Sequence, residues 1–504
     1  MVKGSEFHWQ GRGKHASSLL RHISPRVIHS GRLDKKPGGE PITPIANHAL
    51  DESMKASAPI YFDITDIIEH AMRNSVVTGV QRSAIRIIEG FIRNGCADQI
   101  YGFLKHPVSG QFTLCDLSFM KGAYDIGDFA ARFGLPSGKE AWFAGKLLRY
   151  KNRPVKRLFR KMRLHAQWGA SSSLRKKIEG GGGQGKLLCC LKPLDLKAGG
   201  IIVSLGASWG SDYVGVRQLA KAHECEVVSF VHDILSLSMP ADAVHGAKYK
   251  IVKFVAWLKF IAQNSSLLLC NSAFTENDLR RYLGEQGISA RTAVVRFPHE
   301  FRVSSDQSGA IRSEIKMLAA SKYALCVGRI ESRKNVIGLL KAWTEAREAP
   351  GAKVQLLIVA GKPGAMAGEV FELLQRTENV SGTVQVIDSP NDLELEMLYR
   401  NCQFTVFPSL FEGWGLPIGE SLWFGKPVIC ADNSSMPEVG GEFATYFTHK
   451  APSSLTEVLK QTIVAPPKIP ENIREYLTTW DDTALSVCDQ IVQLEKVDAK
   501  QIIA

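Results

Sequence analysis

Apolar, strand-like runs alternate with helical segments along most of this chain, and the alternation comes in two successive blocks. The first block has such runs at residues 60–64, 201–205, 227–231 and 267–270. The pattern restarts after Phe297-Pro298-His299, with runs at 323–327, 354–360, 384–387, 404–407 and 428–430. Parallel strands need a crossover, usually a helix, between them. The sequence therefore predicts an α/β fold of two Rossmann-like lobes, with parallel sheets facing a central cleft.

The two blocks suggest limits for the domains. A chain of 504 residues is long enough for two or three domains. Residues 1–56 are polar and basic and lack periodicity, which predicts a poorly ordered extension. We assign residues 57–298 to an N-terminal lobe and residues 299–478 to a C-terminal lobe.

A strongly basic segment interrupts the first block, within an insertion at about residues 138–186. Residues 146–177 contain twelve Lys or Arg and no acidic residue. Part of this segment reads as an amphipathic helix whose basic positions include Lys156, Arg157, Arg160 and Lys161. Such helices lie on anionic lipid, where each basic residue contributes about 1 kcal/mol. The alternative is a surface helix packed on its own lobe, and nucleic acid is not expected because no binding motif accompanies the run.

Charge and cysteine usage bear on the cellular location. The chain has 62 Lys and Arg against 50 Asp and Glu, a net charge of +12 that favours an anionic partner. No run of 18 apolar residues predicts a membrane-spanning helix, and the N-terminus lacks an apolar signal core. The ten cysteines include no CxxC pair, which suits reduced thiols. We expect a cytoplasmic protein, peripheral on the inner face of the cell membrane.

The segment around residues 404–420 is the most informative about chemistry. A buried strand at 404–407 is followed by a glycine-containing turn with Glu412, and Pro417 stands where a helix begins. Glu420 lies one turn into that helix. Backbone N–H groups and a positive helix end then meet at one point, which suits a phosphate. Two carboxylates beside it suit the hydroxyls of a sugar and a ribose, so the segment predicts nucleotide-sugar binding.

Two further strand ends carry polar residues. Gly328 permits a tight exit from the first strand of the second block, and Arg329 and Lys334 bring two cations to the same edge. His232 and Asp233 end a strong strand of the first block. Because ligands of open α/β sheets bind at the carboxyl ends of strands, both sets are expected to face the cleft.

Other positions in the first lobe give weaker signals. Gly79, in Thr78-Gly79-Val80-Gln81-Arg82, would let the backbone approach donor phosphates from across the cleft. Ser272 follows the run at 267–270 and is a second acceptor candidate beside Asp233. Helix caps are predicted from a capping side chain followed three positions later by an acidic residue, at Asn391 with Glu394 and at Thr275 with Asp278.

The segment from Glu412 to Glu438 resembles the E-x7-E signature of the family-4 retaining glycosyltransferases, which have the two-lobed GT-B fold. The match includes the E-G-[aromatic]-G-L-P core and the later G-K-P-V and M-P-E strings. The resemblance runs, with gaps, from about residue 58 to about residue 480. It implies that Glu412 holds sugar hydroxyls and Glu420 the ribose. The donor-binding N–H groups would be those of Gly413, Trp414, Gly415 and Leu416.

The resemblance also implies roles for other positions. Arg329 and Lys334 match the pair that neutralises the donor diphosphate, so that neither a metal nor a cofactor is expected. His232 matches the histidine at the transferred sugar. The string around Gly79 looks like the glycine loop of some bacterial mannosyl- and related transferases. Trp480-Asp481 resembles the start of a terminal helix, residues 479–504, that crosses back to the first lobe.

These features predict a retaining glycosyltransferase. We expect it to move a hexose, with mannose favoured, to a lipid-linked or saccharide acceptor in surface polysaccharide assembly. GDP-mannose is the favoured donor, and a UDP- or dTDP-sugar stays open. Two alternatives remain, a nucleotide-sugar 2-epimerase of the same fold and a non-catalytic polysaccharide-assembly scaffold. Release of nucleoside diphosphate only when acceptor is present would separate the three.

Overall fold

The computed structural model describes residues 55–72, 78–106, 110–121, 194–239, 248–303, 311–354, 356–364 and 367–503. The described residues all belong to one unit, residues 44–504. Nearly all of the predicted N-terminal extension lies outside them. So does the whole predicted basic insertion, with Lys156, Arg157, Arg160 and Lys161.

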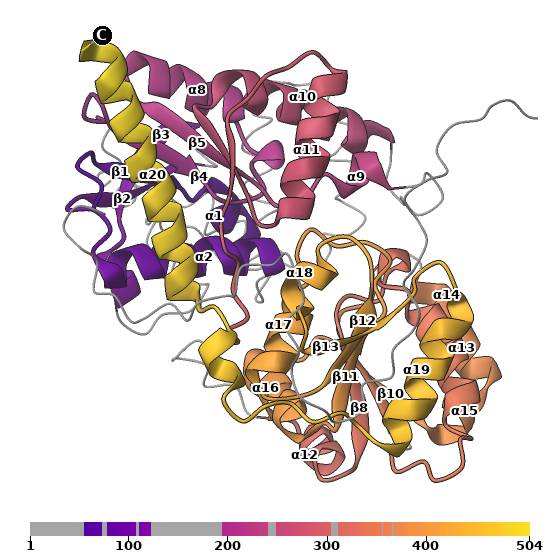
Figure 1. Cartoon of the computed structure of the whole chain (residues 1–504). Helices are drawn as coiled ribbons and strands as arrows, with labels where there is room; N and C mark the ends of the chain where they lie inside the picture. Colours follow the sequence, from indigo (N-terminus) through magenta and orange to yellow (C-terminus); the bar gives the residue numbers. More distant parts are fainter. Residues whose placement is uncertain are drawn as a thin grey trace, which may run out of the picture. The chain divides into compact units, whose positions relative to one another are not determined.

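The first lobe, coloured from indigo to magenta in Figure 1, is built on a sheet whose strands, in the described part of the chain, run in the order β3-β2-β1-β4-β5-β6-β7. Their bounds are β1 Ile60–Asp63, β2 Ile100–Lys105, β3 Phe112–Asp116, β4 Ile201–Ser204, β5 Glu226–Val231, β6 Leu267–Cys270 and β7 Thr292–Val294. Neighbouring strands are parallel except β2 and β3, which form an antiparallel edge. The carboxyl ends of the parallel strands therefore share one edge.

Helices cover both faces of this sheet. They are α1 Thr65–Ala71, α2 Gly79–Asn94, η2 Ser118–Lys121, η3 Ser208–Gly210, α8 Tyr213–Ala222, α9 Leu235–Ser238, α10 Lys248–Asn264 and α11 Ala273–Glu285. Alternate residues of β1 face opposite layers, because successive side chains of a strand point to opposite faces. Ile60 and Phe62 join the core with α1 and α2, whereas Tyr61 joins the core with α8. Both faces of the strand are thus buried.

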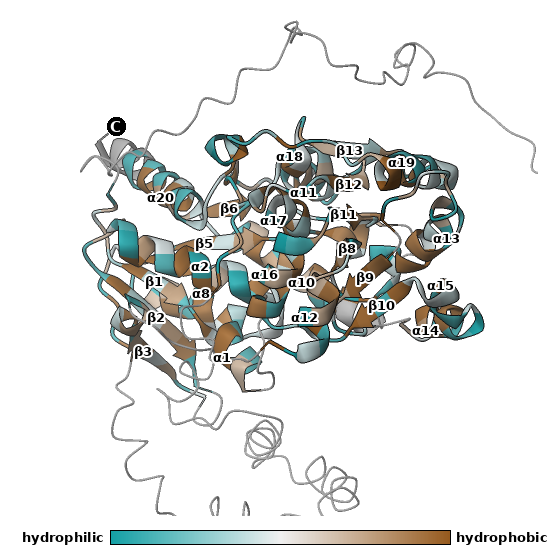
Figure 2. Cartoon of the chain, turned by 90° about the horizontal axis from the view of Figure 1, so that it is seen from below, coloured by the Kyte–Doolittle hydropathy of each residue, from teal (hydrophilic) through white to brown (hydrophobic). Residues whose placement is uncertain are grey.

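The second lobe repeats the plan with a parallel sheet in the order β10-β9-β8-β11-β12-β13. Its described strands are β8 Tyr323–Val327, β9 Leu356–Ala360, β10 Val384–Ile387, β11 Phe404–Phe407, β12 Val428–Ala431 and β13 Ala444–Phe447. Its helices are α12 Ser313–Ala319, η4 Ser332–Lys334, α13 Val336–Ala346, α14 Ala367–Arg376, α15 Glu378–Gly382, α16 Asp392–Asn401, α17 Leu416–Trp423, α18 Met436–Gly440, α19 Pro452–Val464 and η5 Ile473–Tyr476. Figure 2 shows the apolar character of the central strands of both sheets.

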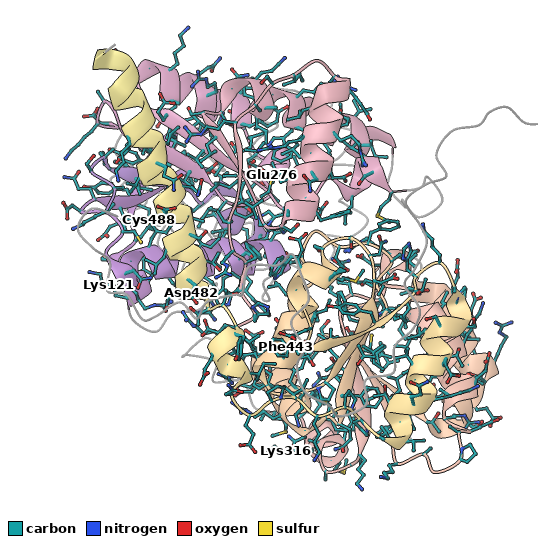
Figure 3. The ribbon with its side chains drawn as sticks, in the orientation of Figure 1. Lys121, Glu276, Lys316, Phe443, Asp482 and Cys488 are labelled. Carbon is teal, nitrogen blue, oxygen red and sulfur yellow. The ribbon has the colours of Figure 1, made fainter. Side chains whose placement is uncertain are left out.

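Two segments link the lobes and are hydrogen-bonded to each other. The His299 N–H donates to the Thr478 carbonyl at 2.9 Å, and the Thr478 hydroxyl donates to the Phe297 carbonyl at 2.8 Å. The second segment leads into α20 (Trp480–Ile503), whose Trp480 and Cys488 are buried in the first-lobe core with α2. Figure 3 marks Cys488 on this helix. Residues that follow the second lobe in sequence therefore complete the core of the first.

The predicted fold class is confirmed, and most predicted strands lie within a residue or two of the observed ones. Strands β2, β3, β7 and β13 were not predicted. One predicted cap is correct: Asn391 and Glu394 form a reciprocal capping box at α16. The other is wrong, because Ser272, not Thr275, caps α11. No helix in the described ranges combines the length and apolar character needed to cross a bilayer.

Candidate active site

The loop between β11 and α17 has the predicted strand–turn–helix form. Helix α17 starts at Leu416, with Pro417 in its first turn. Gly415, at the N-cap, has a φ of 109°, a conformation that side chains other than glycine rarely adopt. Residues 413–416 thus connect Glu412 to the N-terminal end of α17, which carries the positive end of the helix dipole.

Glu412 is the most strongly bound carboxylate of the site. Its Oε1 lies 2.6 Å from Lys334 Nζ, and its Oε2 lies 2.6 Å from Arg333 Nη1. Burial alone would raise the pKa of Glu412, but Arg333 and Lys334 outweigh it and hold that pKa at about 2. Glu412 is therefore ionised throughout the physiological pH range, and its position is fixed from two sides.

The two cations come from the short turn η4, directly after β8. Lys334 is half-buried, with 15% of its side chain exposed, and its Nζ lies 4.6 Å from the centre of the Phe407 ring. Arg333 also donates to the Phe411 carbonyl at 2.8 Å, so that it holds both the carboxylate and the loop that carries it. The sequence analysis assigned no role to Arg333, because this residue matches no functional position of the resembled family, although its place next to Lys334 in a tight turn was a signal for it.

Arg329 does not join this cluster. Its Nε lies 3.7 Å from Glu331, and about half of its side chain (52%) is exposed. The preceding Gly328 has a φ of 149°, and its carbonyl lies so close to Gly361 that a Cβ there would come within 1.9 Å. The chain leaves β8 where Gly328 and Gly361 approach each other closely, in agreement with the tight exit that was predicted at Gly328. The diphosphate role of Arg329 stays a prediction.

Glu420 is on α17, and its partners come from α16 and α2. Its Oε2 accepts from the Tyr399 hydroxyl at 2.7 Å, and its Oε1 lies 3.4 Å from Arg82 Nη1. Arg82 belongs to the first lobe, and its Nη2 also lies 2.8 Å from Asp392. The sequence analysis quoted Arg82 but gave it no role, and it did not find Tyr399.

His232 is buried at the end of β5. Its Nε2 lies 2.7 Å from the Leu205 carbonyl and must carry the ring proton, since a carbonyl only accepts. Burial lowers the pKa of His232 to about 4, so the imidazole is neutral at physiological pH. Its own carbonyl touches the second lobe: a Cβ on Gly413 would lie 2.2 Å from the His232 oxygen. Only glycine allows this approach of the two backbones.

The two acceptor candidates differ in their surroundings. Asp233 accepts from the Leu235 N–H at 3.2 Å, and burial raises its pKa against the opposing effect of Arg333 in the second lobe. Ser272 is fully buried, and its hydroxyl caps α11 and contacts the Gly413 carbonyl at 2.8 Å. The Ser272 hydroxyl is thus occupied within the protein, whereas Asp233 lies beside the charged cluster.

The start of α11 is a contact between the lobes. The Glu438 carboxylate accepts from the Ala273 and Phe274 N–H groups at 2.8 and 2.7 Å. Glu438 belongs to the M-P-E string of α18. A negative side chain from the second lobe therefore meets the positive end of a first-lobe helix.

The remaining predicted donor-binding residues line the same region. Gly79 is the first residue of α2, and Thr78 does not cap that helix with its side chain. A Cβ on Gly79 would lie 3.8 Å from the Leu416 side chain, so these two positions face each other across the lobes. Trp414 donates its indole N–H to the Pro298 carbonyl at 3.1 Å and so ties the loop to the linking segment.

Residues 310–480 match the family model described as "Glycosyl transferases group 1". This chain carries a glycosyltransferase group 1 domain. All of the second-lobe site residues named above fall within the matched range. Among the described residues, no group of three or more His, Cys, Asp or Glu is arranged to hold a metal ion. The roles given to single residues of the domain remain predictions.

Two curated proteins of Escherichia coli are similar to this chain. The serotype-specific mannosyltransferase WbdA is 27% identical over 252 residues, which are 48% of this chain and 30% of WbdA. The O-antigen chain mannosyltransferase B is 35% identical over 125 residues, which are 25% of this chain and 32% of that protein. The matches thus span about a third of these relatives' length.

A solved structure supports the fold. Sucrose-phosphate synthase from Thermosynechococcus elongatus superposes with a TM-score of 0.51 at 16% sequence identity. The superposition covers 87% of this chain and 94% of that one. The similarity therefore extends over both lobes, beyond the limits of the group 1 domain.

Proposed function

We propose that this protein is a retaining glycosyltransferase that moves mannose from GDP-mannose to a saccharide or lipid-linked acceptor in surface polysaccharide assembly. The observation that carries the proposal is the buried Glu412, held ionised by Lys334 and Arg333 beside the N-terminus of α17. This cluster lies in a group 1 domain whose relatives include mannosyltransferases.

The charges of the site suit a departing diphosphate. Negative charge grows on the diphosphate as the bond to the sugar breaks. Lys334, Arg329 and the N–H groups of residues 413–416 would stabilise it, which is the largest effect available to such a site. Glu412 would hold hydroxyls of the transferred sugar. Cationic side chains can supply this stabilisation without a metal.

The ion pairs of Glu412 argue against a covalent role. A carboxylate with a pKa of about 2 that is bound by two cations is a weak base and a weak nucleophile. Reaction on the front face of the sugar, with the leaving phosphate accepting the acceptor's proton, fits this environment better. His232, neutral and hydrogen-bonded to Leu205, would lie at the sugar without transferring a proton.

The proposal is tested with a panel of nucleotide-sugars in which release of nucleoside diphosphate is followed with and without saccharide acceptor. We expect GDP-mannose to be the preferred donor, acceptor-dependent release of GDP, and a product that keeps the anomeric configuration. Glu412→Ala should reduce transfer by more than about tenfold, which is 1.4 kcal/mol. Glu396→Ala, which removes a partly exposed glutamate paired with the exposed Arg400, is the control and should stay active.

Other results would contradict the proposal. Release without acceptor, together with epimerised sugar, would identify a 2-epimerase. No turnover of any donor would favour a scaffold. Turnover of a UDP- or dTDP-sugar alone would keep the enzyme class and overturn the choice of donor.

Attachment to the membrane rests on the basic insertion. We expect the protein to sediment with vesicles that contain anionic lipid and to be released by salt, because the Debye length falls from about 10 Å at 0.1 M to about 3 Å at 1 M. Replacing four basic residues by Glu should abolish sedimentation and spare transfer to a soluble acceptor: Lys156, Arg157, Arg160 and Lys161. Equal sedimentation of both proteins would refute a membrane role for this segment.

A further inference from the structure

The carboxylate of Glu420 is held by groups from both lobes. Tyr399, on α16 of the second lobe, donates to Oε2 at 2.7 Å. Arg82, on α2 of the first lobe, approaches Oε1 with Nη1 at 3.4 Å. The side chain of Glu420 is 6% exposed and that of Arg82 is 17% exposed. A buried carboxylate of the second lobe thus has its nearest cation in the first.

The two partners of Glu420 have different roles. The short bond from Tyr399 fixes the orientation of the carboxylate within its own lobe. The contact with Arg82 is too long for a strong hydrogen bond, but it places a positive charge beside Oε1. Oε1 therefore keeps acceptor capacity for a ligand hydroxyl while the charge of the carboxylate is balanced.

The surroundings of Arg82 indicate that this contact is not made mainly for stability. Its strong bond, at 2.8 Å, goes to Asp392 at the start of α16. Its buried Nε has no hydrogen-bond partner among the described residues, which costs free energy. Asp392 thus orients the guanidinium, and the remaining amino group faces Glu420.

Electrostatics make the charge of Glu420 depend on Arg82. Burial raises the pKa of Glu420, and Arg82 is the largest opposing influence. The other groups that face this carboxyl are Tyr399 and Asp392 on α16 and, farther away, Lys334 on η4. Asp392 raises the pKa of Glu420, whereas Tyr399 and Lys334 lower it. Without Arg82, a larger fraction of the Glu420 side chains would be protonated.

We propose that Arg82 is a positioning residue for donor binding, because it reaches across the lobes and places its positive charge beside the Glu420 carboxylate, which would accept the hydroxyls of the donor's ribose. The inference rests on the proposed function, in which Glu420 binds the ribose. It adds a link between the lobes: the second lobe binds the ribose well only when α2 of the first lobe is in place.

The position of Arg82 in α2 strengthens this link. Gly79 and Arg82 lie three residues apart in the first turn of the helix, so they share one side of it. Gly79 faces Leu416 at the start of α17, and Arg82 faces Glu420 one turn further along. One helical turn of the first lobe would therefore face both the phosphate end and the ribose end of the donor.

The experiment measures the dissociation constant of the nucleotide-sugar by calorimetry between about pH 5.5 and about pH 8.5. Arg82→Gln removes the charge, and Arg82→Lys keeps it. An opposite charge at this range shifts a carboxyl pKa by about 1–3 units. We expect Arg82→Gln to bind at least about tenfold more weakly near pH 6 and to recover as the pH rises. Arg82→Lys should follow the wild-type profile more closely.

Two further variants separate this role from a structural one. Arg86→Met removes another buried arginine of α2, which pairs with Glu89, and should leave the pH profile unchanged. In Glu420→Gln the charge is already lost, so adding Arg82→Gln should weaken binding by less than about twofold. Arg82→Met, which replaces the guanidinium 5.8 Å from the centre of the Phe301 ring by an apolar group, is used instead of Arg82→Gln in these tests if that variant does not fold.

The outcomes are distinguishable. If Arg82→Gln keeps the wild-type pH profile, or weakens Glu420→Gln by the full tenfold, Arg82 does not act through Glu420 and the inference is overturned. If Glu420→Gln itself binds donor as well as the wild type does, the ribose role in the proposed function fails instead. Circular dichroism of each variant shows that the fold is intact.

Discussion

Arg333→Met is the substitution whose effect the structure defines best. It removes one of the two cations that bind Glu412 and leaves the Phe411 carbonyl without its partner, while an apolar side chain still fills the space. Lys334 stays in place at 2.6 Å from the other carboxylate oxygen. We expect lower stability and lower transfer, because Glu412 and its loop lose one side of their support.

The size of the effect follows from the pKa of Glu412. A fall from 4.5 to about 2 corresponds to about 3 kcal/mol of stabilisation of the ionised form. Arg333 is the strongest of the influences that lower this pKa, and a hydrogen bond to a charged group is worth about 1.5–3 kcal/mol. We therefore expect Arg333→Met to lower the free energy of unfolding by about 1.5–3 kcal/mol near pH 7.

The sign of the pH dependence is fixed by the direction of the shift. Because the folded-state pKa of Glu412 is depressed, its contribution is fully present above pH 4.5 and is lost as the pH falls towards 2. Urea unfolding followed by tryptophan fluorescence should thus show a smaller difference between variant and wild type at about pH 3.5 than at about pH 7. A difference that is absent at pH 7, or equal at both pH values, would refute the reasoning.

Arg329→Met is the matched control for this prediction. Arg329 lies four residues away, is about half exposed (52%), and has its Nε 3.7 Å from Glu331. Exposed ion pairs of this kind contribute about 0–1 kcal/mol. The control should keep nearly wild-type stability and still bind donor less well, which separates support of Glu412 from contact with the diphosphate.

Three further results are expected. Gly413→Ala should lower transfer by at least about tenfold, because the added methyl would lie 2.2 Å from the His232 carbonyl oxygen and push the backbones of the two lobes apart. The control Gly368→Ala, in open space on α14, should leave transfer unchanged in the same assay. Glu438→Gln should lower the free energy of unfolding by about 0.3–1 kcal/mol at low salt and by less at high salt, because it removes a charge from the N-terminus of α11; thermal unfolding at two ionic strengths measures this, and a salt-independent loss would contradict it. Transfer should survive EDTA, since side-chain cations are expected to neutralise the diphosphate; activity lost in EDTA and restored by magnesium or manganese would show that a metal is needed.

The local parts of the fold could be predicted from the sequence. Strand β11 and the start of α17 agree with the prediction because the apolar run, the glycines and Pro417 each act over a few residues. The unpredicted strands have weaker patterns: β7 has three residues and none of them is buried, and β3 is an antiparallel edge strand with an exposed end. Their pairing partners, more than their own residues, make them strands.

The same holds for the candidate site, where residues in local motifs could be predicted and residues with distant partners could not. Glu412, Lys334 and Glu420 could be found because each stands at a fixed place in a local motif. Arg82 could not be given a role, because its partner Glu420 lies 338 positions away and no short-range pattern links them. The cap at α11 was misplaced for a related reason, since Ser272 and Thr275 are both good capping residues and only the folded chain distinguishes them.

The return of α20 to the first lobe decides how this protein can be divided. Trp480, Val487 and Ile491 belong to the same apolar core as α2. The two helices are far apart in the chain: Arg93 of α2 contacts Asp481 of α20, which lies 388 positions later. A fragment that stops at residue 298 would therefore leave the inner face of α2 open to water and prone to aggregation. Separating the lobes takes two cuts, one at each linking segment, and the first fragment then needs residues 480–503 supplied as a second chain.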